Sequence, residues 1–240
     1  MEIKDMIGRR KSVRNYTNEP VNEETLAEIK AFIARMKPLD PALRFDWEIV
    51  TADRVRCILP WKAPQLVAIY AEDGPGGLEN AGFLFQQLDL YLQGRGIGAC
   101  WLGMGKPEQQ LTAKDGLPFC ILLAFGYPGG DALREGPAEF KRKALREIAD
   151  EPDKRLEPAR LAPSSTNSQP WFFTHEDGRI DVWRVVRGGL MRRAFEKMNR
   201  VDMGIALAHL YAANMESFRF FMAKEPPRRK GYVYTGSVTL

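Results

Sequence analysis

The sequence predicts an α+β fold of mostly antiparallel sheet with helices on its faces, built from two related halves. The order helix, strand, long apolar helix, strand occurs twice along the 240 residues, although direct identity between the halves is slight. Asp177–Gly178 separates two aromatic segments in the manner of a hairpin turn. We therefore expect a first half over residues 1–138 and a second half over residues 139–240, packed closely together.

The first half is expected to open with a short helix that ends near Gly8, followed by an extended stretch over residues 13–21. Asn22 is a suitable N-cap for the next helix, because Glu23 and Glu24 place acidic groups in its first turn. Apolar segments then predict strands and one strong amphipathic helix. The strands are expected at residues 45–49, 63–70 and 119–125, and the helix at residues 80–93.

The second half begins with helical character over residues 140–148, and prolines at 152 and 158 interrupt the chain beyond it. The hairpin strands are expected at residues 171–174 and 180–183. An apolar helix is expected over residues 202–218, and an alternating closing strand over residues 231–240.

Composition places the chain among ordinary globular proteins, with 45% hydrophobic and 28% charged residues. The polar start predicts no signal peptide, and no apolar run approaches the ~20 residues of a bilayer span. With three scattered cysteines, these features predict a cytoplasmic protein with reduced thiols and no membrane partner. The two histidines lie beside no acidic or cysteine cluster, which argues against a metal site and a Ser-His-Asp site.

The net charge of +4 comes from short basic clusters rather than one long stripe. A nucleic-acid-binding protein usually gathers its lysines and arginines along one face. Separate clusters suit one or two phosphate groups better, so we expect no nucleic-acid partner.

The first segment that could carry chemistry contains Arg10, Lys11, Ser12 and Arg14. Guanidinium groups, a hydroxyl and free backbone N–H groups together form a good site for a terminal phosphate. Side chains at positions 10, 12 and 14 share one face of an extended chain. The alternative for this segment alone is a basic surface turn.

The second segment is the loop over residues 162–171, which is dense in neutral hydrogen-bonding groups. Such a loop can pair with the uracil-like edge of a flavin, which offers both donors and acceptors. A polar linker is the alternative, although Trp171 follows directly and ties the loop to a core strand. Its candidate residues are Pro163, Ser164, Ser165, Asn167 and Gln169.

The third segment is the glycine-rich run over residues 94–103. It follows a helix and lacks the GxGxxG spacing, so it is not a Rossmann fingerprint. We expect a helix end that leads into a buried strand. Exposed backbone at Leu102 and Gly103 could still approach a flat cofactor ring.

Together these segments resemble the FMN-dependent nitroreductase family over nearly the whole chain. Residues 10–14 are similar to its phosphate-binding opening, residues 162–171 to its flavin-edge loop, and residues 96–101 to the segment before its ring-contacting backbone. Residues 142–145 resemble a later basic segment that reaches the phosphate. The resemblance implies a nitroreductase-like fold.

One departure concerns the order of the segments. Family members usually carry the flavin-edge loop soon after the first helix, whereas residues 37–41 have lost that pattern and the loop lies in the second half. The chain therefore resembles a tandem-half branch in which the usual two-fold dimer is fused into one polypeptide. This pseudo-dimer implies one FMN site between the halves, and a monomer in solution is plausible.

The resemblance implies an NAD(P)H-dependent oxidoreductase that reduces small aromatic or conjugated acceptors by ping-pong electron transfer. Arg10, Lys11, Ser12, Arg14 and Arg142 would hold the FMN phosphate and its surroundings, and the flavin-edge residues would hold the ring. Arg14 could also lie near N1 and the C2 carbonyl of the flavin. No side chain need be catalytic, because the flavin carries the chemistry and meets NADH or NADPH and the acceptor in turn. The alternative is a flavin-binding protein or basic interaction module without physiological turnover.

Overall fold

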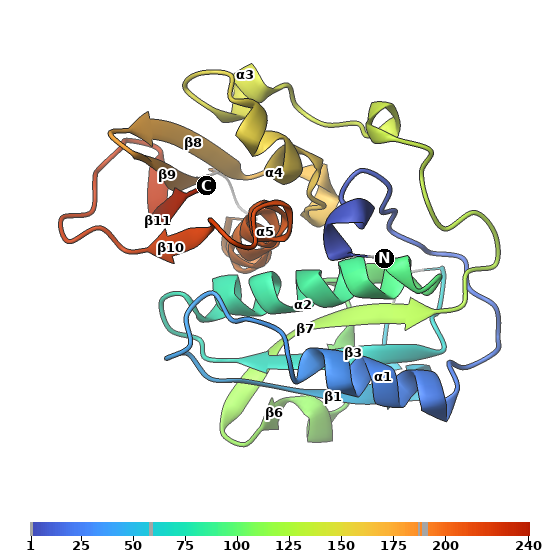
Figure 1. Ribbon diagram of the computed structural model, residues 1–240. Helices are drawn as coiled ribbons and strands as arrows, with labels where there is room; N and C mark the ends of the chain where they lie inside the picture. Colours follow the sequence, from blue (N-terminus) through green and yellow to red (C-terminus); the bar gives the residue numbers. More distant parts are fainter. Residues whose placement is uncertain (1, 58–59, 187, 189–191) are drawn as a thin grey trace.

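Two antiparallel sheets form from opposite ends of the chain. The computed structural model describes residues 2–57, 60–186, 188 and 192–240 (Figure 1). The first sheet has the order β1-β3-β7-β4, and a short strand, β6, pairs with β7. Its strands are β1 (Phe45–Thr51), β3 (Gln65–Ala71), β4 (Gly98–Leu102), β6 (Ala113–Lys114) and β7 (Leu117–Gly126).

The second sheet has the order β10-β11-β9-β8 and lies entirely after the first in sequence. Its strands are β8 (Trp171–Glu176), β9 (Arg179–Val185), β10 (Arg219–Phe221) and β11 (Tyr232–Thr239). Gly178 adopts φ +72° in the turn between β8 and β9, which confirms the predicted hairpin. A separate two-stranded ribbon joins β2 (Val55–Arg56) to β5 (Lys106–Pro107).

Helices α2 (Gly77–Gly94) and α5 (Arg192–Ala213) lie between the two sheets (Figure 1). The other α-helices are α1 (Glu23–Ile33), α3 (Leu145–Ile148) and α4 (Glu157–Leu161). The 3₁₀ turns are η1 (Ile3–Met6), η2 (Ala52–Arg54), η3 (Gln109–Leu111), η4 (Pro137–Glu139), η5 (Lys154–Leu156) and η6 (Ser165–Asn167). As predicted, Asn22 caps α1, its side chain accepting a hydrogen bond from the Thr25 amide at 2.9 Å. Within the described residues, no helix is both long and apolar enough to traverse a bilayer.

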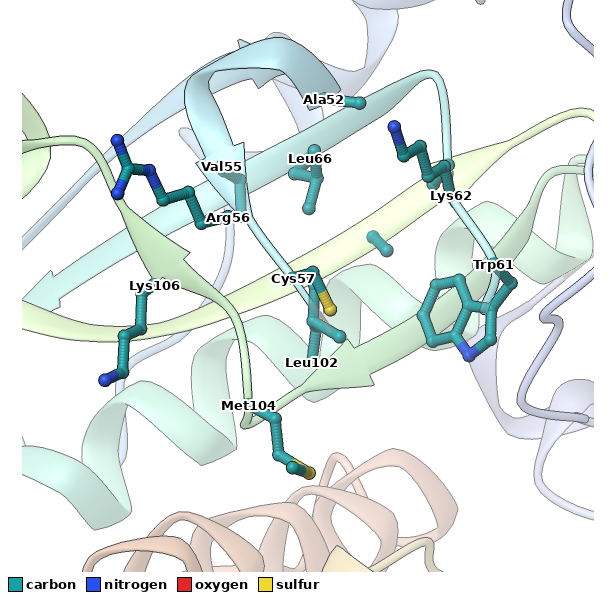
Figure 2. Close-up of a pocket in the computed structure, with 12 residues that line it drawn as sticks. Ala52, Val55, Arg56, Cys57, Trp61, Lys62, Leu66, Leu102, Met104 and Lys106 are labelled. Atoms are coloured by element: carbon teal, nitrogen blue, oxygen red, sulfur yellow. The ribbon is translucent and has the colours of Figure 1, made fainter. Parts of the chain in front are cut away.

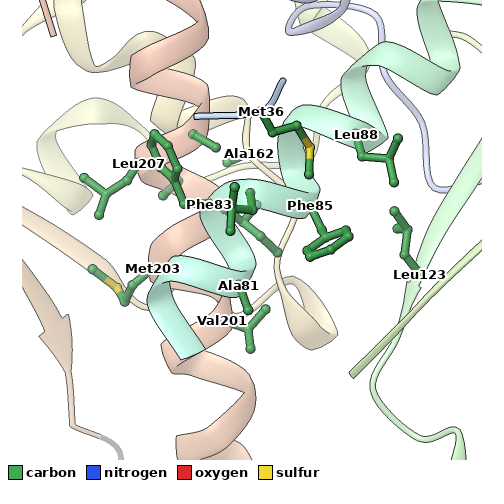
Figure 3. Packing of buried hydrophobic residues seen from close by; sticks show 14 of the residues in the cluster. Met36, Ala81, Phe83, Phe85, Leu88, Leu123, Ala162, Val201, Met203 and Leu207 are labelled. Carbon is green, nitrogen blue, oxygen red and sulfur yellow. The ribbon is translucent and has the colours of Figure 1, made fainter. Parts of the chain in front are cut away.

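Helices α2 and α5 cross in the middle of the molecule (Figure 1). Two glycines let their backbones touch: a Cβ on Gly82 would lie 2.1 Å from the Val201 oxygen, and one on Gly204 would lie 1.8 Å from the Glu79 oxygen. Figure 3 shows Phe83 of α2 beside Leu207 of α5, with Phe85 turned toward β7. One apolar core therefore runs from the first sheet through both helices to the second sheet.

The predicted strands and long helices are present, with differences at three places. The helix expected over residues 140–148 is reduced to α3, because the segment before it is hydrogen-bonded to the loop at residues 162–169 instead of to itself. Helix α5 begins ten residues before position 202 and ends at Ala213, before Phe218. Pro158, expected only to interrupt the chain, lies in the first turn of α4, where a missing N–H costs nothing. The division at residues 138 and 139 stays a prediction; it falls in the long connection from β7 to α3 (Figure 1).

Candidate functional site

The three segments singled out in the sequence border one cavity of about 290 Å³, here called the central cavity. The first half contributes Ser12, Arg14 and the end of β4 at Leu102–Gly103. The second half contributes the loop from Pro163 to Thr166 and one face of α5. The cavity is therefore lined by residues from both sides of the predicted division at residues 138 and 139.

Local packing explains why residues 12–14 reach this cavity. Ser12 forms a parallel bridge to Ala99 of β4, and the Val13 amide donates to the Ala99 carbonyl at 3.0 Å. Val13 is buried against Gly98, where a Cβ would lie 2.8 Å from the Val13 Cβ. Because side chains alternate along an extended segment, Ser12 and Arg14 lie on the opposite side, facing the cavity.

Arg10 is not exposed on a turn; its side chain is buried in an ion pair with Asp89 of α2. Its Nε donates to Asp89 at 2.8 Å, and its Nη2 donates to the Ser12 hydroxyl at 3.3 Å. Asp89 also accepts hydrogen bonds from the side-chain amides of Gln86 at 2.8 Å and Gln93 at 2.9 Å. The guanidinium thus anchors the first segment to α2.

The same network extends to the cavity wall and to α5. The Trp101 indole, which lines the cavity, donates to the Gln86 side-chain oxygen at 2.9 Å. The Gln86 amide lies 3.1 Å from Nε2 of His209, and Nδ1 of His209 lies 3.0 Å from the Pro158 carbonyl. Burial, with the nearby charge of Arg10, lowers the pKa of His209 to about 3. The imidazole is therefore neutral, donating from Nδ1 and accepting at Nε2.

The loop at residues 163–169 has an unusual backbone. Thr166, Asn167 and Gln169 have φ values of 52°, 57° and 46°, a left-handed region that side chains other than glycine seldom occupy. The Ser165 amide donates to the Asp202 carboxylate of α5 at 3.0 Å, and the Gln169 amide donates to the Ser164 hydroxyl at 2.9 Å. Strained backbone held by surrounding contacts is common at ligand sites.

Two side chains that were predicted to bind the ring instead hold the loop in place. The Asn167 oxygen accepts from Arg142 at 2.8 Å, and its amide donates to the Lys141 carbonyl at 2.9 Å. The Gln169 oxygen accepts from the Lys143 amide at 2.8 Å. These side chains fasten the loop to residues 141–143 and do not line the central cavity.

Positive charge gathers behind the loop. Arg142 donates to the Ala162 carbonyl at 3.0 Å, and burial together with the charges of Arg10, Arg134 and Arg160 lowers its pKa to about 10. Burial and the charge of Arg10 also lower the pKa of Arg134. Asp89 and Glu157 pair with Arg10 and Arg160, whereas no acidic partner within the described residues pairs with Arg134 or Arg142. A bound anion would relieve this repulsion.

Seven of the twelve predicted site residues line the central cavity: Ser12, Arg14, Leu102, Gly103, Pro163, Ser164 and Ser165. Lys11 borders an adjoining hollow of about 450 Å³ that also touches Ser12 and Arg14. Arg10, Arg142, Asn167 and Gln169 lie behind the lining, in the contacts described above.

The sequence analysis missed the rest of the lining, which is Trp61, Cys100, Trp101, Met104, Ile121, Thr166, Met198, Val201, Asp202 and Ile205. Four of these are spaced three and four residues apart on one face of α5. That spacing could have been recognised had the helix been predicted to begin before position 202.

Comparison with known proteins places the chain in a family. A family model described as "Putative TM nitroreductase" matches residues 2–214. The crystal structure of "a putative nitroreductase" from Thermotoga maritima superposes with a TM-score of 0.68 at 22% identity, covering 99% of this chain and 92% of that chain. This likeness shows a shared fold over the whole chain.

Two further solved structures are similar over part of the chain. An FMN-dependent nitroreductase from Clostridium difficile has a TM-score of 0.45 at 16% identity, covering 59% of this chain and 98% of that chain. A structure named "Putative NADH dehydrogenase/NAD(P)H nitroreductase" from Parabacteroides distasonis has a TM-score of 0.44 at 19% identity, covering 61% and 95%. A search of curated proteins returned no significant match.

Proposed function

The chain belongs to the nitroreductase family described as "Putative TM nitroreductase", and from that membership we propose that it is an FMN-dependent oxidoreductase. It takes electrons from NADH or NADPH and passes them to small aromatic or conjugated acceptors. The observation that carries this proposal is the convergence of Ser12 and Arg14, Leu102–Gly103 and Pro163–Ser165 on one cavity between the halves.

The central cavity fits the ring of a flavin. Its walls combine flat or apolar side chains, such as Trp101 and Ile205, with a few polar side chains. Ser164 and Ser165 contribute hydroxyls to the lining, and Arg14 contributes a cation with no hydrogen bond or ion pair in the described part of the chain. A mostly apolar cavity with few convergent polar groups is the usual form of a cofactor site.

The arginines behind the loop fit a phosphate. Arg142 is partly buried near the charges of Arg10, Arg134 and Arg160, and burial together with these charges lowers its pKa to about 10. A phosphate beside Ser12 and Arg142 would accept charge-assisted hydrogen bonds, and its negative charge would offset the repulsion among the arginines, including the buried Arg10. Lys11 adds a further cation in the hollow that shares Ser12 and Arg14 with the cavity.

Bound FMN would supply the redox chemistry, accepting a hydride and passing electrons on. The chain's residues bind and orient. Arg14 would stabilise negative charge at the N1 and C2-carbonyl edge, and Leu102–Gly103 would present backbone to the ring. Asn167 and Gln169 would act by holding Pro163–Ser165 in place.

The experiment that tests this function begins with purified protein saturated with FMN and desalted. Mass spectrometry of the released cofactor should identify FMN, and anaerobic addition of NADH or NADPH should bleach the yellow absorbance. When one equivalent of the nicotinamide has been used, one equivalent of an aromatic nitro compound should accept the two flavin electrons and restore the colour. Retained FMN with no bleaching by either nicotinamide would indicate a flavin-binding protein without turnover. Release of FAD, or failure to bind FMN, would refute the proposal.

We also propose that the contact of α2 with α5 takes the place of the two-fold contact of a dimer, so that one chain holds one site. The support is the continuous core across both helices and the close approach at Gly82 and Gly204. A monomer is then sufficient, which sedimentation equilibrium of the flavin-saturated protein would test.

A further inference from the structure

A second cavity of about 670 Å³ adjoins the central cavity and is here called the basic cavity. The two share Trp61, Leu102 and Met104, so they meet at the end of β4. Figure 2 shows β2 and β5 carrying Arg56 and Lys106 at one end of the basic cavity, with Trp61 and Lys62 at the other. A ligand could therefore lie in both cavities at once.

Among the described residues that line the basic cavity, three are cationic and none is acidic; the cations are Arg56, Lys62 and Lys106. None of the three forms an ion pair within the described residues, which are 2–57, 60–186, 188 and 192–240. Neighbouring cations differ in this respect. Arg54 lies 3.6 Å from Glu108, and Lys114 lies 2.9 Å from Asp46.

Two of these cations are placed against each other by the sheet register. Arg56 and Lys106 are direct partners in the antiparallel pairing of β2 with β5. Like charges directly opposite one another destabilise a strand pair, since their side chains share one face. An anion between them would convert the repulsion into two attractions, so the pair favours an anionic ligand.

The remainder of the lining is apolar. Val55, Leu66, Leu102 and Ala124 form one surface, and Trp61 offers an aromatic side wall at the junction with the central cavity. A ligand that fits has a flat, apolar ring at the junction and an acidic group at the Arg56–Lys106 end.

We propose that the basic cavity holds the acidic end of a small-molecule substrate whose ring lies at the junction with the central cavity. The redox role of that ligand rests on the proposed function, whereas anion binding by Arg56 and Lys106 does not. Two sources carry this chemistry: the phosphates of a nicotinamide dinucleotide, or the acidic group of an aromatic acceptor.

The test compares wild type with the double variant Arg56→Gln/Lys106→Gln. A matched control, Lys30→Gln/Arg228→Gln, removes two exposed cations of the same types outside both cavities. The double variant should be at least as stable as wild type, because it removes a like-charge pair. A loss of binding that is caused by unfolding would therefore be recognised by a lower stability of the double variant.

Calorimetric titration uses three probes: adenosine 2′,5′-bisphosphate, 4-nitrobenzoate and neutral 4-nitrobenzyl alcohol. We expect at least one acidic probe to bind wild type and the control. The double variant should bind that probe with about tenfold or more lower affinity and bind the neutral probe with unchanged affinity. Binding of the bisphosphate identifies the dinucleotide as the source, and binding of the nitrobenzoate identifies an acidic acceptor. Raising the salt concentration should weaken the acidic probe alone.

The inference is overturned if neither acidic probe binds wild type at millimolar concentration, or if the double variant binds, with unchanged affinity, every acidic probe that wild type binds. These outcomes are distinct from failure of the proposed function. A protein that cannot be bleached by NADH or NADPH but loses the acidic probe in the double variant still has the anion site. A protein that bleaches normally and treats acidic and neutral probes alike lacks it.

Discussion

Replacement of Arg10 by methionine should lower the stability of the protein substantially, although the sequence alone predicts that this residue binds a phosphate. In the structure its guanidinium is 1% exposed and donates to Asp89 at 2.8 Å. The variant leaves the Asp89 carboxylate, itself 0% exposed, without its cation. Methionine fills most of the volume of the aliphatic stem, so the change tests the charge rather than the packing.

The size of the stability loss follows from the energy of the Arg10–Asp89 ion pair. Unit charges about 4 Å apart attract by about 4 kcal/mol at an effective dielectric constant of 20. Loss of one partner of a buried ion pair costs about 3–5 kcal/mol in measured cases. Asp89 keeps hydrogen bonds from Gln86 and Gln93, which partly solvate its charge. We therefore expect the free energy of unfolding of the apoprotein to fall by about 3 kcal/mol.

Urea denaturation of flavin-free protein measures this loss. The double variant Arg10→Met/Asp89→Asn removes both charges, keeps an acceptor oxygen, and should recover at least half of it. Arg14→Met is the matched comparison, because Arg14 is exposed at the central cavity. It should leave apoprotein stability within about 0.5 kcal/mol and raise the FMN dissociation constant about tenfold or more. A loss below about 1 kcal/mol for Arg10→Met, or no recovery in the double variant, would refute the reasoning.

Two further predictions concern stability. Burial alone would lower the pKa of His175, but its hydrogen bonds to Asp150 and Asp153 outweigh burial, so its pKa is raised. The same hydrogen bonds help to lower the pKa values of the two carboxyl groups. The stabilisation is thus present between about pH 4 and 6.5 and is lost as pH rises through the raised pKa or falls through the lowered ones. His175→Gln should cost up to about 1 kcal/mol at pH 5.5 and much less at pH 9, and an equal cost at both values would contradict this account. Gly204→Ala should cost about 1–3 kcal/mol or more, since its Cβ would lie 1.8 Å from a backbone oxygen of α2. Gly74→Ala, with open space around its Cβ, is the control, and equal melting temperatures for the two variants would argue against the close helix contact.

Much of the fold could be predicted because its strongest signals are local. Asn22 before two glutamates caps a helix whatever lies around it, and Asp177–Gly178 forms a hairpin turn through backbone conformation alone. The segment at residues 140–144 could not be predicted in this way. Its helical propensity is overridden by tertiary hydrogen bonds from Arg142 and Lys143 to a loop some twenty residues later.

The residues of the candidate site likewise divide into those that a local pattern predicts and those that depend on tertiary contacts. Ser12 and Arg14 could be placed on one face by the alternation of an extended chain. That Arg10 turns instead toward Asp89 depends on α2, which no pattern within residues 9–14 can indicate. Likewise, Asn167 and Gln169 have the composition of a ligand-binding loop, but the structure uses their amides to hold that loop to residues 141–143. The charge opposition of Arg56 and Lys106 is visible only once β2 and β5 are in register.

The stoichiometry of FMN binding tests the central claim most directly, which is that segments from both halves build a single flavin site. Apoprotein of known concentration is titrated with FMN, and the quenching of flavin fluorescence is followed to saturation. The account predicts that the titration curve breaks at one FMN per polypeptide. The Lys30→Gln/Arg228→Gln control should show the same break, and Arg14→Met should show a more gradual curve because it binds FMN more weakly. A break at two FMN per chain, or no saturable binding, would contradict it.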